Sequence, residues 1–353
     1  RMKKFALLLG AAVAVMATAS FAAELPEQNF KVIGTWGTAS MYKDYEAPMW
    51  TTDVPNASGG KIKTDVQAIT DLGLSGTETI KLLSTGAYDA GFALYAYIVS
   101  GNPVFEGLDL ALVPQNADEQ RKLVDAYSPT VEKAMSDIHG VKLMTDYPFP
   151  LPLIACRDEF KGLFDLKGRK IRTFSTTLGD MVDGLGGVSV SIPLAEVPTA
   201  LQRGVVDCAV SSGMAMYYAK WFDVVHYLYE MPVVSGMGFL GMTKARWDKL
   251  DPDTQAFLDE QSKAFADKTW SATKEDEQQG IACLTGETLG GPSCRHGEPA
   301  KMKLVRTSAE DAALRTKVLD EFVLKRFGER CGPECSAAWD KTAGAAVGLS
   351  IQK

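Results

Sequence analysis

The sequence has 353 residues, of which 46% are hydrophobic, and a formal net charge of −7. An acidic chain is a poor partner for nucleic acid and for anionic membrane surfaces, although a cleft within it can still hold an anion through its own local field. A chain of this length exceeds what one hydrophobic core usually supports, so we expect two lobes.

Residues 1–23 have the pattern of a cleaved signal peptide. Lys3 and Lys4 form a short basic region, residues 5–16 are apolar, and small residues suited to signal peptidase follow as far as Ala23. The alternative is a membrane anchor, but the apolar run is shorter than the ~20 residues that span a bilayer. We therefore expect export, cleavage and a periplasmic location.

Alternating strand and helix patterns predict a first α/β lobe over residues 24–148, completed by about 236–276. The order of strand, helix, strand, helix and strand is the start of a doubly wound sheet. A long helix should follow, broken by Ser128 and Pro129, and the chain should then resume as a strand. The expected strands are 29–36, 61–69, 88–95 and 141–144, and the expected helices are 42–52, 77–84 and 118–138.

A second lobe with the same alternation is expected over residues 149–235 and about 277–345. Prolines alternate from Pro148 to Pro152, which forbids helix and favours an extended crossing strand at a hinge. Glycine and proline accumulate again near residues 231–242, where a return crossing is expected. The remaining predicted strands are 153–156, 170–174, 188–192 and 205–210, and the helices are 177–185, 195–203, 244–279 and 309–327.

Six cysteines in an exported chain predict disulfides. Proximity along the chain or within the second lobe favours three pairs: Cys331 with Cys335 in a tight local loop, Cys283 with Cys294, and Cys156 with Cys208. The alternative for Cys283, Cys294 and His296 is a metal site, which lacks a fourth ligand at suitable spacing.

The segment from Asp165 to Asp207 carries the candidate binding residue. It begins Asp-Leu-Lys-Gly-Arg-Lys-Ile-Arg, a turn that leads into a short strand and places Arg172 at the mouth of an α/β unit. A guanidinium held there can grip a carboxylate through two parallel hydrogen bonds. A strand-end arginine is more often a surface residue, and Glu196, at a helix N-terminus, is read as structural or as a partner that orients Arg172.

The segment ends with residues 196–207, a helix, a glycine stop and a second strand. This pair of sequences, with Lys220–Asp223 after it, resembles the DctP-type extracytoplasmic solute-binding proteins of TRAP transporters. The resemblance implies an α/β fold of two lobes, like a type II periplasmic binding protein, with a cleft between the lobes, crossing strands and a long linking helix. It implies that Arg172 clamps the carboxylate of an organic acid. By position, Ser211 and Ser212 would add polar contacts, although a serine at a strand end is also common in turns.

Family contacts from the first lobe come from the ends of its first and third strands, which here carry Trp36 and Tyr95. With Phe149 of the crossing segment, these aromatic residues would form an apolar wall for the ligand. Trp36 can equally pack between strand and helix. The second arginine of several relatives is absent from residues 149–152, which favours a monocarboxylate, keto acid or aromatic acid over a compact dicarboxylate.

Catalytic patterns do not appear in the sequence. The histidines lie in unrelated contexts, and nucleophile elbows, zinc-protease motifs and phosphate loops are missing. We expect a monomeric binding protein with no cofactor and no metal, which hands its acid to the TRAP membrane subunits. The alternatives are a binding subunit of an ABC importer or of a sensor, and a secreted α/β enzyme.

Overall fold

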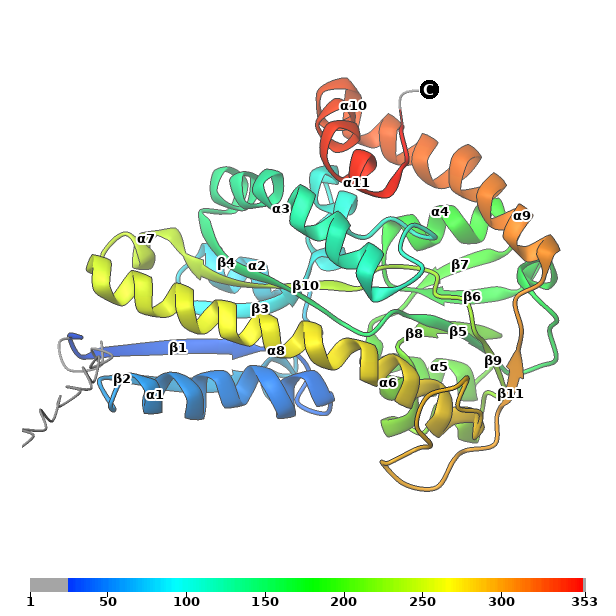
Figure 1. The fold of residues 1–353 in the computed structure, drawn as a ribbon, viewed down its shortest axis with the longest axis horizontal. Coiled ribbons are helices and arrows are strands. Elements are labelled where there is room, and N and C mark those ends of the chain that lie inside the picture. The colour runs from blue at the N-terminus through cyan, green and yellow to red at the C-terminus, as the bar shows by residue number, and fades with distance from the viewer. Residues whose placement is uncertain (1–24, 352–353) are drawn as a thin grey trace, which may run out of the picture.

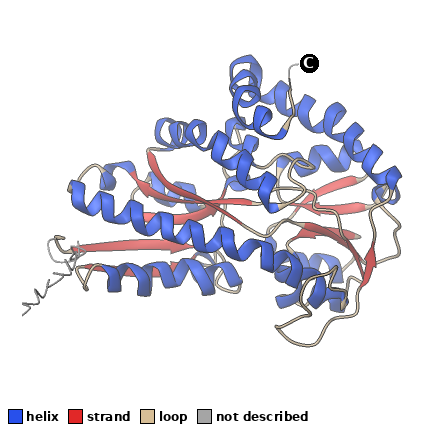
Figure 2. Cartoon of the chain, viewed as in Figure 1, coloured by secondary structure: helices blue, strands red, loops and turns tan. Residues whose placement is uncertain are grey.

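The computed structural model describes residues 25–351, so the predicted signal peptide lies outside the described residues. Two β-sheets lie at opposite ends of an elongated molecule, and helices cover both of them (Figure 1 and Figure 2). No helix in residues 25–351 has the length and apolar character that crossing a membrane requires. The two sheets are the framework of the expected α/β fold with two lobes.

The first sheet has five strands in the order β2-β1-β3-β10-β4. The first three are parallel, while β10 runs antiparallel to both of its neighbours. All five side chains of β3 are buried, as expected for a central strand covered on both faces. The bounds are β1 Gln28–Gly34, β2 Ile62–Ala68, β3 Ala90–Leu94, β4 Val141–Pro148 and β10 Met237–Thr243.

The second sheet has six strands in the order β11-β9-β5-β8-β6-β7. Its centre is the antiparallel pair β5 and β8, and β6 lies parallel to β8. The bounds are β5 Leu153–Cys156, β6 Lys170–Thr173, β7 Val188–Ser191, β8 Cys208–Ser211, β9 Tyr227–Tyr229 and β11 Lys303–Val305.

The helices confirm the predicted alternation, and one difference from the predicted helices lies at Pro129. A single helix, α3, runs through Ser128 and Pro129, where a break was predicted. Its buried residues Leu123, Tyr127 and Val131 continue one apolar face past the proline, and packing along that face outweighs the lost backbone hydrogen bond. The α-helices are α1 Val54–Ala57, α2 Thr79–Ser84, α3 Ala117–His139, α4 Thr176–Gly184, α5 Val197–Gln202, α6 Gly213–Tyr218, α7 Lys244–Trp247, α8 Pro252–Thr285, α9 Ala309–Val318, α10 Lys325–Trp339 and α11 Ala345–Val347.

Short 3₁₀ turns lie in several connections, and π-helical segments continue directly into α-helices. The predicted helix 42–52 is a pair of π-helical turns, η2 Met41–Glu46 and η3 Met49–Asp53. The others are η4 Ile69–Leu72, η5 Tyr95–Tyr97, η6 Pro103–Leu108, η7 Leu163–Leu166, η8 Leu194–Glu196, η9 Trp221–Asp223, η10 Leu319–Leu324 and η11 Asp340–Gly344.

Two extended segments and one long helix connect the sheets. The crossing segment after β4 lies beside the one before β10, and Phe149 N–H donates to Gly236 O at 2.9 Å. Helix α8 passes along both sheets (Figure 1) and packs against β4 of the first and against α6 in the second lobe. The predicted helix 244–279 is interrupted before α8 because Asp251 caps the new helix, accepting from Thr254 N–H at 3.0 Å.

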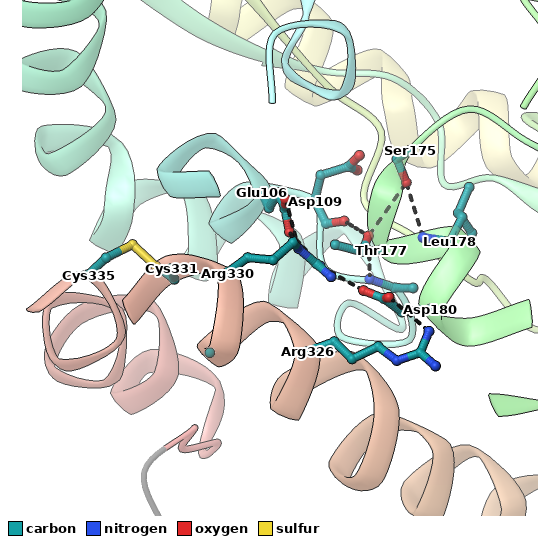
Figure 3. Close-up of polar contacts among 12 residues, drawn as sticks. Glu106, Asp109, Ser175, Thr177, Leu178, Asp180, Arg326, Arg330, Cys331 and Cys335 are labelled. Carbon is teal, nitrogen blue, oxygen red and sulfur yellow. Dashed lines mark hydrogen bonds and ion pairs between the residues drawn. A yellow bond between two sulfur atoms is a disulfide. The ribbon is translucent and has the colours of Figure 1, made fainter. Parts of the chain in front are cut away.

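The C-terminal helices contact both lobes. Arg330 of α10 forms ion pairs with Glu106 of η6 at 2.6 Å and with Asp180 of α4 at 2.7 Å (Figure 3). The tight loop predicted at Cys331 and Cys335 is instead a kink within α10. Gly332 has a φ of 75° there, a left-handed conformation that glycine adopts without strain and that turns the helix around the disulfide.

Candidate functional site

A cavity of about 410 Å³ lies between the two sheets. Residues from both lobes and from the crossing segment line it, as a ligand site between lobes requires. Aliphatic and aromatic side chains form most of its walls, and hydroxyl groups, one guanidinium and one carboxylate provide the polar groups. Its main lining residues are Trp36, Ser40, Tyr97, Phe149, Arg172, Phe174, Leu194, Ser211, Ser212, Met214, Tyr218 and Asp276.

Arg172 of β6 reaches this cavity from the second sheet, and only 1% of its surface is exposed. Its Nε–H donates to Ile192 O at 2.8 Å and an Nη1–H donates to Val210 O at 2.7 Å, so two carbonyls fix the plane of the guanidinium. The guanidinium carbon lies 5.2 Å from the centre of the Phe174 ring. Burial lowers the pKa of Arg172 to about 10, which leaves the group cationic at neutral pH.

The charge of this buried cation is not compensated by an ion pair in the part of the chain that the structure describes. No carboxylate in residues 25–351 forms an ion pair with Arg172. Glu196, considered as an orienting partner, is exposed and does not contact the guanidinium; the backbone carbonyls orient it instead. A buried charge is costly unless it is paired, so the cavity favours an anion beside Arg172.

The conspicuous sequence pattern around Arg172 has a structural explanation. The carboxylate of Asp207 accepts from Lys170 N–H at 2.8 Å, and Asp207 N–H donates to Lys170 O at the same distance. These contacts fix the start of β6 beside the segment that enters β8. The Cys156–Cys208 disulfide then joins β8 to β5 at directly opposed residues. Together they hold the ends of β6 and β8 at the cavity.

Five of the six predicted contact residues lie together. Trp36, Phe149, Ser211 and Ser212 line the cavity with Arg172. The two serine hydroxyls make no hydrogen bond within the described chain, so both are free to serve a ligand. Trp36 also packs as an interior residue: its indole N–H donates to Ser75 O at 3.1 Å, and its ring meets Phe149 edge-on at 6.3 Å.

Tyr95 does not line the cavity, contrary to the prediction. The chain leaves β3 through the 3₁₀ turn η5, which directs Tyr95 into the core against Phe105 and Phe239, while Tyr97 lines the cavity. Tyr95 is fully buried, and its hydroxyl donates to the Asp146 carboxylate. Tyr97 lines the cavity together with Arg172; burial raises the pKa of this tyrosine, and the charge of Arg172 opposes that rise.

The sequence prediction missed several lining residues. Phe174 lies two residues after Arg172, and the alternation of side chains along a strand could have identified it. Tyr218 and Asp276 come from α6 and α8, whose orientation depends on packing between distant segments. No pattern near Asp276 distinguishes it from the other acids of a polar helix.

The remaining disulfides lie away from the cavity lining. Cys283 pairs with Cys294, and Cys331 pairs with Cys335, as predicted. The metal alternative for Cys283, Cys294 and His296 therefore loses its two thiolates. In the described part of the chain, no group of three or more histidine, cysteine, aspartate or glutamate residues is placed to hold a metal ion.

Solved structures share this architecture. An extracytoplasmic solute receptor of Bordetella pertussis, DctP7, which binds pyroglutamic acid, matches with a TM-score of 0.77 at 18% identity, covering 89% of this chain and 98% of that one. A TRAP periplasmic solute-binding protein of Desulfovibrio salexigens with bound orotic acid matches with a TM-score of 0.77 at 15% identity, covering 90% and 99%. At these identities the matches show the fold.

Sequence relatives cover less of the chain. An uncharacterized protein of Haemophilus influenzae is 22% identical over 55% of this chain, and a solute-binding protein of Verminephrobacter eiseniae is 32% identical over 35% of it. The chain spans 60% and 38% of these two curated relatives. The family match is broader, since residues 23–304 match the DctP family, bacterial extracellular solute-binding protein family 7. The chain therefore belongs to the DctP family of bacterial extracellular solute-binding proteins.

Proposed function

We propose that this protein is the periplasmic receptor of a TRAP transporter and that it captures an organic acid by its carboxylate at Arg172. The observation that carries the proposal is the buried guanidinium, which faces a cavity between the lobes and has no ion-pair partner in residues 25–351. The acids bound by the two similar structures, pyroglutamic acid and orotic acid, support the same ligand class.

The proposed roles follow from the positions of the lining residues. Arg172 holds the carboxylate, the hydroxyls of Ser211 and Ser212 bind polar groups beside it, and Trp36, Tyr97 and Phe149 enclose the apolar body. Closing the lobes excludes water and strengthens the ion pair. The proposed activity is capture, closure and delivery to the TRAP membrane subunits, without a covalent step or a cofactor.

The test is a thermal-shift screen of organic acids, including pyroglutamate and orotate, followed by calorimetry on Arg172→Met. Truncating one partner of a buried charge pair should weaken binding of any acid that the wild type binds by ~2–5 kcal/mol. The matched control is Arg203→Met, which removes an exposed arginine after α5, away from the cavity. Equal acid affinity in wild type and Arg172→Met would reject the proposed anchor.

A further inference from the structure

The lining of the large cavity contains two charged side chains among the described residues, Arg172 and Asp276. They come from different parts of the fold, strand β6 and helix α8. The rest of the lining is aromatic, aliphatic or uncharged polar. The cavity therefore has one positive and one negative group, although a site built only for an anion needs no carboxylate.

Packing between two helices directs Asp276 to this position. A Cβ atom on Gly213 of α6 would come within 2.7 Å of Gly280 Cα of α8, so the two helices touch at these glycines. Asp276 lies four residues before Gly280 and so projects from the same face of α8. That face meets the start of α6, next to Ser212, where both residues line the cavity.

Asp276 is also unpaired. It forms no hydrogen bond and no ion pair within residues 25–351. Burial raises its pKa, the charge of Asp44 adds to that rise, and His296 opposes it. An adjoining cavity of about 300 Å³ shares Ser40, Met214, Tyr218 and Asp276 with the large one. The nearby Glu275 is paired with Arg295, so Asp276 itself is available to a ligand.

We propose that Asp276 makes the site selective for acids that carry, in addition to the carboxylate held at Arg172, an ammonium or another N–H donor, and that it rejects dicarboxylates. This inference rests on the proposed function, because Arg172 must hold the acid end. A donor would satisfy the unpaired carboxylate, and the ring of Tyr218 beside it is suited to a cation. A second carboxylate there would meet a like charge, which disfavours the wrong ligand.

The test compares probes that differ only at the distal group. One set is δ-aminovalerate, valerate and glutarate; the other is para-aminomethylbenzoate, para-toluate and terephthalate. Calorimetry on the mature protein should show, in at least one set, that the amine binds about tenfold or more tightly than the methyl compound, as a hydrogen bond to a charged group implies, and that the diacid binds weakest.

The decisive variant is Asp276→Asn, which keeps the shape and removes the charge. We expect the preference for the amine to fall to less than about threefold and binding of the diacid to strengthen. The matched control is Glu260→Gln, which removes one negative charge from the exposed face of the same helix and should leave the order unchanged.

Three outcomes overturn the role of Asp276: a wild type that binds the diacid at least as tightly as the amine, a wild type that binds neither amine, or an Asp276→Asn variant with the wild-type order. The proposed function is judged separately. If the wild type binds the diacid and Arg172→Met abolishes that binding, Arg172 is confirmed as the carboxylate anchor and the proposed selectivity of Asp276 is rejected.

Discussion

Arg172 illustrates how a strand can hold a charge ready for a ligand. Its two contacts with Ile192 O and Val210 O use the backbone of the neighbouring segments, so the guanidinium is oriented without being neutralised. An internal carboxylate would hold the same group equally well but would compete with the ligand. The pairing of a fixed cation with the free hydroxyls of Ser211 and Ser212 is what makes this end of the cavity suitable for an acid.

Tyr97 lines the cavity and Tyr95 does not, so substituting Tyr95 should affect stability rather than binding. Tyr95→Phe removes a buried donor from Asp146, a carboxyl group whose pKa burial raises to about 6. Leaving that group with fewer partners should lower the free energy of unfolding by ~1–3 kcal/mol. Because Tyr95 lies outside the cavity, acid affinity should stay within about twofold of wild type. Urea denaturation and calorimetry test both parts, and a large loss of affinity without loss of stability would contradict this assignment.

At the scale of elements, the C-terminal helix α10 acts as a bridge between the lobes. Arg330 joins Glu106, which is 4% exposed, to Asp180, which is 7% exposed (Figure 3). Burial raises the pKa of Glu106, and the charge and hydrogen bonds of Arg330 oppose that rise. Arg330 is therefore shared by two buried carboxylates, and Asp180 is also reached by Arg326.

Removing that arginine should destabilise the molecule more than removing a surface ion pair. We expect Arg330→Met to lower the free energy of unfolding by about 2 kcal/mol, since it removes the cation paired with the buried Glu106 and leaves Asp180 with Arg326. Lys133→Met, which breaks a pair exposed on both sides, is the matched control and should cost less than ~1 kcal/mol. Equal losses in the two variants would argue against the bridge.

The elements show which parts of the structure local sequence could predict. Strand β5 coincides with its predicted bounds, and β6 and β7 differ by one residue, because β-branched residues between turn residues define them locally. The continuity of α3 through Pro129 and the kink at Gly332 depend on packing from elsewhere in the chain. The same distinction holds for the site. The place of Arg172 could be predicted from its own strand, whereas the place of Asp276 depends on how α8 packs against α6.

For the whole molecule, the cavity depends on connections that run between the lobes. The crossing segments at Phe149 and Gly236 and the helix α8 contribute lining residues as well as links. A relative movement of the two sheets therefore changes the ligand site directly, without an intermediate element. A ligand that touches both lobes should in turn stabilise the closed arrangement.

The whole molecule should also lose stability as pH rises, because it buries carboxyl groups that favour the neutral form. Glu46 is fully buried, and burial raises its pKa from 4.5 to about 7 in spite of hydrogen bonds from Thr35 and Tyr147. Burial raises the pKa of Asp109 to about 7 and contributes in the same direction. Tyr42 and Tyr147, which face Glu46, have raised pKa values and stay neutral in this range.

Glu46 holds its proton more tightly in the folded protein than in the unfolded chain, and this difference sets the direction of the pH dependence. Below about pH 4.5 Glu46 is protonated in both, whereas between about pH 4.5 and 7 the unfolded chain releases its proton and the folded protein retains it. The free energy of unfolding of the wild type, relative to Glu46→Gln, should therefore fall by up to ~3 kcal/mol over that interval. Urea denaturation of both proteins across this pH interval measures the difference. The contributions of Asp109 and of the other acids are the same in both proteins and therefore cancel. A difference that stays constant with pH would mean that Glu46 ionises at its ordinary pKa, and that its partners Thr35 and Tyr147 compensate its charge fully in the folded protein.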